Sequence, residues 1–156
     1  MSQNLKIGEK APDFSLPADG GREIALKSYA GQKLVLYFYP KDDTSGCTQE
    51  AIEFNGLRQE FAKAGTAILG VSPDPVKKHD KFKAKYELEF PLLSDQQKHM
   101  LEAYGVWVEK SMYGRKYMGV ERTTVLIAAD GTIAQVWPKV KVPGHAAEVL
   151  AAAQKL

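Results

Sequence analysis

The amino-acid sequence predicts an α/β fold in which helices flank a mixed central sheet, with a β-hairpin near the amino terminus. In the first two thirds of the chain, short apolar runs alternate with amphipathic helical patterns, which is typical of parallel strands joined by helices. A strong hairpin pattern follows and adds antiparallel strands. The 156 residues, 44% of them apolar, contain no repeat or linker-like stretch. We therefore expect one domain over residues 1–156.

The first predicted elements are a hairpin and a buried strand. Residues 14–16 and 23–26 flank a turn at residues 19–21 (DGG), which predicts a small peripheral hairpin because glycine adopts positive φ at little cost. Residues 34–39 (LVLYFY) form a continuous apolar run, as expected for a central strand buried on both faces. Pro40 ends that strand, since proline has no backbone N–H to donate.

A helix, a strand and a second helix follow. Residues 48–64 carry apolar side chains at every third or fourth position, which predicts one amphipathic helix that Gly65 terminates. Residues 66–72 (TAILGVS) match a second buried strand. Residues 74–75 (DP) then provide an N-cap and a proline suited to the first helical position, and a helical stripe covers residues 76–86.

The remaining elements complete the sheet. Residues 90–94 match a third strand, and Asp95 caps a short helix after it. Residues 123–137 predict a hairpin whose turn lies at residues 130–131 (DG). An Ala-rich last helix covers residues 144–155.

The segment 106–120 (VWVEKSMYGRKYMGV) fits neither the helical nor the strand period well. We predict a long loop near the functional site, because extended loops in compact domains are often functional. Trp107, Tyr113 and Tyr117 either line a pocket there or pack within the loop.

Composition and charge exclude several classes of protein. The net charge of +2 is too nearly balanced for a nucleic-acid or membrane-surface binder, and no apolar run approaches the ~18 residues of a membrane span. A single cysteine, Cys47, excludes an intrachain disulfide and any all-cysteine zinc or iron–sulfur site. Together with an amino terminus that lacks an apolar signal segment, these features predict a soluble cytoplasmic protein.

Cys47 is the most informative residue, because it falls at the first turn of a predicted helix. Unpaired backbone N–H groups and the helix dipole favour an anion there, so the thiolate is stabilised over the thiol. Lowering a thiol pKa from about 8.5 to about 6 requires about 3.4 kcal/mol, whereas a helix terminus contributes at most about 2 kcal/mol. A nearby cation must supply the remaining stabilisation of the thiolate. Arg122, immediately before a buried strand, is the best candidate, and Lys41 and Arg115 are weaker ones on predicted loops.

Each of these residues also has an ordinary structural interpretation. A lone cysteine is more often a small buried apolar residue than a nucleophile, although the small polar neighbours of Cys47 argue against a core position. Thr44 and Ser45 are equally consistent with helix capping, and Arg122 with a surface ion pair. The histidines are not spaced as metal ligands, and we expect surface or packing roles for His79, His99 and His145. We expect no metal site and no cofactor.

The chain resembles the peroxiredoxins, and more narrowly the PrxQ or bacterioferritin comigratory protein subfamily. The most specific match is the cysteine motif at residues 40–48 (PKDDTSGCT) with Arg122 downstream. Further matches lie at residues 8–16 (GEKAPDFSL), 91–95 (PLLSD) and 113–122 (YGRKYMGVER), so the likeness covers nearly the whole chain.

The resemblance implies a thioredoxin-like fold and a peroxidase that reduces hydrogen peroxide and organic hydroperoxides without metal, haem or flavin. It implies that Cys47 is the peroxidatic cysteine, which becomes a sulfenic acid. Arg122 would hold the thiolate and the peroxide, and Thr44 would orient them. Pro40 would shield the pocket, and we also expect Gly46 at the substrate-binding site.

Two departures from the PrxQ pattern bear on the catalytic cycle. Ser45 replaces the usual proline of the motif. The usual positions of a resolving cysteine are occupied by Ile52 and, on the next helix, by Lys83. The resemblance is therefore to a one-cysteine member, whose reductant is an external thiol such as glutathione, glutaredoxin or thioredoxin. We expect a monomer, with a transient dimer through Cys47 of two chains as an alternative.

Two other functions compete with the peroxidase interpretation. One is a non-enzymatic thioredoxin-like binding or chaperone module in which Cys47 is inert. The other is a thiol–disulfide oxidoreductase, which the sequence disfavours because Cys47-Thr48-Gln49-Glu50 is not a CxxC motif.

Overall fold

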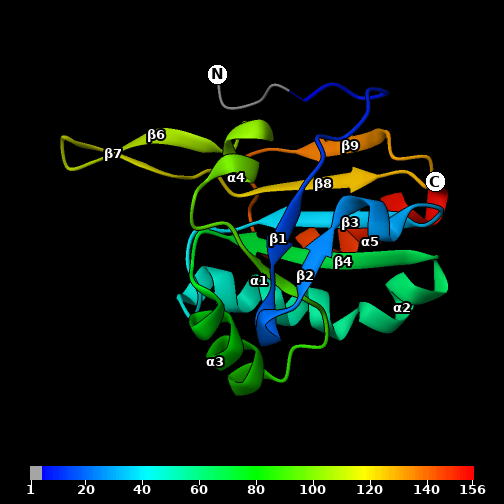
Figure 1. Ribbon diagram of the computed structural model, residues 1–156, viewed down its shortest axis with the longest axis horizontal. Coiled ribbons are helices and arrows are strands. Elements are labelled where there is room, and N and C mark those ends of the chain that lie inside the picture. Colours follow the sequence, from blue (N-terminus) through cyan, green and yellow to red (C-terminus); the bar gives the residue numbers. More distant parts are fainter. Residues whose placement is uncertain (1–4) are drawn as a thin grey trace.

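The computed structural model describes residues 5–156 and contains a five-stranded mixed sheet at its centre (Figure 1). The strand order is β5-β4-β3-β8-β9. Strands β3, β4 and β5 are parallel, whereas β8 and β9 are antiparallel to their neighbours. This arrangement confirms the predicted α/β class and the mixed sheet.

The strands are short and, apart from β6 and β7, lie close to the predicted ranges. In chain order they are β1 (Ser15–Pro17), β2 (Glu23–Ala25), β3 (Lys33–Phe38), β4 (Thr66–Ser72), β5 (Leu92–Ser94), β6 (Trp107–Met112), β7 (Arg115–Val120), β8 (Thr123–Ile127) and β9 (Ile133–Trp137). The helices are α1 (Ser45–Gly56), α2 (Arg58–Lys63), α3 (Val76–Tyr86), α4 (His99–Ala103) and α5 (His145–Lys155), with 3-10 turns at Asp19–Gly21 and Leu26–Tyr29. Pairing of β1 with β2 confirms the amino-terminal hairpin.

The central strands alternate their side chains between two apolar cores. Leu34, Leu36 and Phe38 of β3 face the core that α4 and the amino-terminal hairpin cover. Val35 and Tyr37 face the core under helices α1, α2, α3 and α5. Burial on both faces explains why residues 34–39 form a continuous apolar run.

Several predicted helix boundaries are wrong. The expected single helix over residues 48–64 begins earlier, at Ser45, and is divided into α1 and α2 at Leu57, whose ψ of 5° departs from helical geometry. Asp74 does not cap α3, because Pro75 holds the N-cap position and no side chain accepts a hydrogen bond there. The Asp74 carboxylate instead accepts the backbone N–H of Asp42 at 2.6 Å. Asp95 is not the N-cap of α4 either, because Lys98 holds that position, although the Asp95 carboxylate accepts the Leu101 N–H in the first turn.

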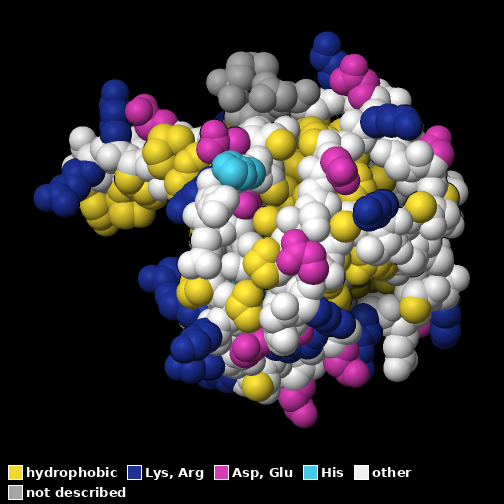
Figure 2. Space-filling view, viewed as in Figure 1, with side chains coloured by type: hydrophobic (Ala, Val, Ile, Leu, Met, Phe, Trp, Pro, Cys, Tyr) yellow, Lys and Arg dark blue, Asp and Glu magenta, His cyan; other side chains and the backbone are white. Residues whose placement is uncertain are grey.

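The predicted loop over residues 106–120 is also wrong, because the segment forms the β6–β7 hairpin. Its turn uses positive φ at Tyr113 (52°) and Gly114 (78°). The hairpin projects from the body of the molecule and carries apolar and basic side chains (Figure 2). Tyr113 is 98% exposed, whereas Trp107 packs against the core at the hairpin base. Within residues 5–156, no helix is long and apolar enough to cross a membrane.

Candidate active site

Cys47 is the third residue of α1 and lies where the loop from β3 enters the helix. Thr44 occupies the N-cap position, and its carbonyl accepts the first helical bond, from Thr48 N–H at 2.8 Å. The backbone N–H groups of the first turn therefore have no partner within the helix and surround the cysteine. The Cys47 side chain is only 1% exposed. The predicted position of the thiol at a helix N-terminus is confirmed.

Arg122 reaches Cys47 because of the sheet topology. Strand β8 is antiparallel to β3, with Thr123 opposite Phe38, so the residue before β8 lies beside the end of β3, where the cysteine loop starts. The Arg122 Nη2 is 3.3 Å from Cys47 Sγ. The structure therefore places the predicted cation beside the predicted nucleophile.

Glu50 is the third member of this cluster. It lies one turn after Cys47 on α1, and its Oε1 accepts a hydrogen bond from Arg122 Nη1 at 2.6 Å. Burial raises the pKa of the Glu50 carboxyl to about 7, in spite of the attraction of Arg122. Burial alone would lower the pKa of the Arg122 guanidinium, but Glu50 and Cys47 together raise it above its ordinary value. The guanidinium is thus held as a cation between a carboxyl group and the sulfur.

The other predicted site residues lie in the same loop and first turn. A Cβ added at Gly46 would lie 3.4 Å from Arg122 Nη2, so glycine leaves room for the guanidinium. Thr44 is exposed, and its hydroxyl donates to Lys41 O at 2.9 Å instead of capping the helix. Pro40 is half-buried directly after β3. The described contacts bring Gly46 and Arg122 to Cys47, but include no direct contact of Thr44 or Pro40 with the sulfur.

Comparisons with known proteins place the chain in a family. The family model described as AhpC/TSA family matches residues 7–136. The chain belongs to the AhpC/TSA family. The peroxiredoxin Bcp of Xanthomonas campestris pv. campestris is 51% identical over 148 residues, which are 95% of this chain and 92% of that protein.

Solved structures agree with this assignment. Peroxiredoxin Q of Xylella fastidiosa, solved as a cysteine-to-serine mutant, is 41% identical, covers 98% of both chains and has a TM-score of 0.93. The bacterioferritin comigratory protein of Xanthomonas campestris was solved for insight into its alkyl peroxide reduction activity. That structure is 47% identical, covers 98% of both chains and has a TM-score of 0.90. The predicted peroxiredoxin relationship and thioredoxin-like fold are confirmed.

Sequence reasoning missed two side chains near the sulfur of this AhpC/TSA family member. Glu50 lies two residues beyond the cysteine motif, and no sequence pattern shows its burial or its bond to Arg122. Lys110 lies in the segment predicted as a loop, and on β6 it is near enough for the charges of Arg122 and Cys47 to affect its pKa. The pKa of Lys110 is lowered by burial and by the nearby charge of Arg122, while the charge of Cys47 opposes the change. Of the weaker cation candidates, Lys41 is exposed in the cysteine loop and Arg115 lies exposed on β7, not in a loop.

His99 and His145 have the expected surface and packing roles. His99 is exposed on α4. His145 is 4% exposed, and its Nε2 is 2.8 Å from the Thr124 hydroxyl. His79 is fully buried beneath the cysteine loop, with polar partners at both ring nitrogens.

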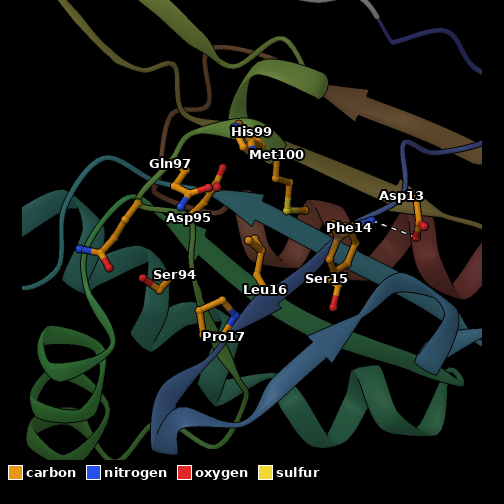
Figure 3. A pocket seen from close by; sticks show the side chains of 11 residues that line it. Asp13, Phe14, Ser15, Leu16, Pro17, Ser94, Asp95, Gln97, His99 and Met100 are labelled. Carbon is orange, nitrogen blue, oxygen red and sulfur yellow. Dashed lines mark hydrogen bonds between the residues drawn. The ribbon is translucent and has the colours of Figure 1, made fainter.

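A separate pocket of about 360 Å³ lies on the sheet face opposite Cys47, between β1, the end of β5 and the start of α4 (Figure 3). Phe14, Leu16 and Met100 supply apolar walls, and Asp95 lies beside them. Because one Asp95 oxygen already accepts the Leu101 N–H, this carboxylate serves the start of α4. None of the predicted site residues lines this pocket.

Proposed function

We propose that this chain is a thiol-dependent peroxidase that reduces hydrogen peroxide and organic hydroperoxides through a sulfenic acid on Cys47. The observation that carries this proposal is the 3.3 Å contact between Arg122 Nη2 and Cys47 Sγ at the N-terminus of α1. Membership of the AhpC/TSA family and the alkyl peroxide reduction named for the Xanthomonas campestris relative support it.

In the oxidative step, the Cys47 thiolate attacks one oxygen of the peroxide. The S–O bond forms as the O–O bond breaks, and the departing oxygen leaves as water or alcohol after taking a proton. Arg122 and the free N–H groups of the first turn of α1 stabilise the charge that moves onto the departing oxygen. Thr44 already donates its proton to Lys41 O, so its oxygen is oriented to accept a hydrogen bond from the peroxide. Pro40 shields the site at the start of the loop.

The reductive step requires a thiol from another molecule, because Cys47 is the sole cysteine. At the usual resolving positions, Ile52 is 48% exposed and Lys83 binds the Asp19 carboxylate at 2.8 Å, so neither supplies a thiol. An external thiol displaces water from the sulfenic acid to give a mixed disulfide, and a second thiol releases Cys47. Glutathione, glutaredoxin and thioredoxin are the reductants to test. We further propose a cytoplasmic monomer in which Cys47–Cys47 pairing of two chains is transient.

The decisive experiment measures peroxide consumption with each reductant, for the wild-type chain and for Cys47→Ser. We expect the serine variant to lose peroxide consumption completely, because a hydroxyl cannot form the sulfenic acid. Mass spectrometry after one equivalent of peroxide and one of thiol should find the adduct on Cys47. Full turnover by the serine variant would exclude the proposal.

The competing interpretation, a binding or chaperone module with an inert Cys47, predicts a different thiol. An inert, buried thiol reacts with alkylating reagents only at high pH, whereas a thiolate beside Arg122 reacts at neutral pH. The guanidinium contact therefore favours the peroxidase, and the pH dependence of alkylation separates the two.

A further inference from the structure

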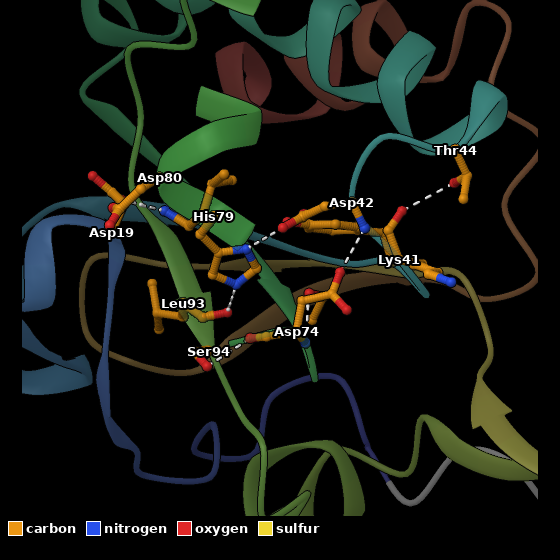
Figure 4. A network of polar contacts seen from close by, with 12 residues as sticks. Asp19, Lys41, Asp42, Thr44, Asp74, His79, Asp80, Leu93 and Ser94 are labelled. Atoms are coloured by element: carbon orange, nitrogen blue, oxygen red, sulfur yellow. Dashed lines mark hydrogen bonds and ion pairs between the residues drawn. The ribbon is translucent and has the colours of Figure 1, made fainter. Parts of the chain in front are cut away.

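A buried polar network lies beneath the loop that joins β3 to α1 (Figure 4). Its centre is Asp42, whose side chain points into the protein and is 3% exposed. One carboxylate oxygen accepts the Tyr39 hydroxyl at 2.6 Å, and the other lies 2.6 Å from His79 Nδ1. The backbone N–H of Asp42 donates to the Asp74 carboxylate at 2.6 Å. Three short hydrogen bonds to Asp42 therefore hold the loop on its buried side.

His79 connects this residue to the rest of the fold. Its ring is fully buried on α3, and Nε2 lies 2.9 Å from the carbonyl oxygen of Leu93 on β5. A carbonyl only accepts, so Nε2 carries a hydrogen and donates it. Nδ1 lies 2.6 Å from Asp42 Oδ2, so each ring nitrogen faces a polar partner. Every polar atom of the ring is therefore used, and the imidazole links α3, β5 and the loop.

The position of Asp42 determines where the catalytic loop lies. The preceding carbonyl, of Lys41, accepts the Thr44 hydroxyl. The following residue, Asp43, has a positive φ of 59°, a backbone conformation that is uncommon for residues other than glycine. A loop with such a backbone needs outside support, and Asp42 provides it two residues before the N-cap of α1.

Resting on the proposed peroxidase function, we propose that His79 is a positioning residue. By holding Asp42, it keeps the loop in the conformation that presents Thr44 and Cys47 to peroxide.

The test compares His79→Gln with His99→Gln, a matched control at an exposed histidine. The two ring nitrogens of His79 reach Asp42 and the Leu93 carbonyl on opposite sides. Glutamine carries both of its N–H donors on one nitrogen, so it does not bridge these two partners. Stopped-flow kinetics would give the rate constant for peroxide, and hydrogen–deuterium exchange would give the opening of residues 41–47. We expect His79→Gln to lower the peroxide rate constant about tenfold and to speed loop exchange about tenfold, with exchange in β3 unchanged. The control should match the wild type.

An unchanged peroxide rate constant, unchanged loop exchange, or equal acceleration of exchange in β3 would each overturn the proposal, the last because it indicates general destabilisation. If His79→Gln does not fold, Tyr39→Phe removes one bond to Asp42 with little change of shape and is judged by the same outcomes at a smaller size. Adding Asp42→Asn to His79→Gln should change little further, because the pair acts as a unit. The exchange measurement needs no peroxide, so it stays decisive even if the wild-type chain proves not to be a peroxidase.

Discussion

Two buried carboxyl groups flank Cys47 in the sequence, and the structure uses them in opposite ways. Asp42 has hydrogen-bond partners at both oxygens, Tyr39 and His79. Glu50 has one partner, Arg122, and its other oxygen has none within residues 5–156. Burial raises the pKa of Glu50 to about 7, so its charge changes at neutral pH. The loop is therefore held by a carboxylate whose oxygens both have hydrogen-bond partners, whereas the Glu50 carboxyl near the sulfur gains or loses its proton around pH 7.

The largest effect should come from removing the cation that Glu50 and Cys47 share. Arg122→Ala should lower the rate constant for peroxide about 10²- to 10³-fold, because one donor to the developing charge is lost and the Glu50 carboxyl remains buried without a counterion. Stopped-flow kinetics would measure this, with Arg115→Ala on the exposed hairpin as the control. A rate within threefold of the wild type would show that Arg122 only packs against the thiol.

The next largest effect concerns the free energy of unfolding, which should depend on pH because of Glu50. The Glu50 pKa is raised from 4.5 to about 7 on folding, so the folded chain holds this proton more tightly than the unfolded chain. Its stabilising contribution is complete below pH 4.5 and is lost as the pH rises through 7, by about 3 kcal/mol in total. Glu50→Gln should remove this decline from the free energy of unfolding measured between pH 5 and 8. The exposed Glu60→Gln should retain it, and a Glu50→Gln curve that falls like the wild type would contradict the assignment.

The sequence predicts some parts of the site and not others, for physical reasons. The ends of apolar runs located Cys47 and Arg122, since strand ends and helix starts are local patterns that the sheet then brings together. The bonds of Asp42 were not predictable, because a charged residue in a loop carries no periodicity that shows whether it points inward. The β6–β7 hairpin was missed because both of its faces are largely exposed, so no alternation of apolar and polar residues marks it.

The smallest effect should come from Asp43, the neighbour of Asp42 in the same loop. It also contacts α3, through Lys85 at 2.9 Å and the Tyr86 hydroxyl at 2.7 Å, but these contacts are exposed. Water competes for exposed charges, and salt screens them, so this second link between loop and helix should add little. Asp43→Asn should change the peroxide rate constant by about twofold at most, and salt should erase the difference, whereas the effect of His79→Gln should persist in salt. Stopped-flow kinetics at low and high ionic strength would check both, and a loss in Asp43→Asn as large as in His79→Gln would mean that burial is not what makes the Asp42 contact effective.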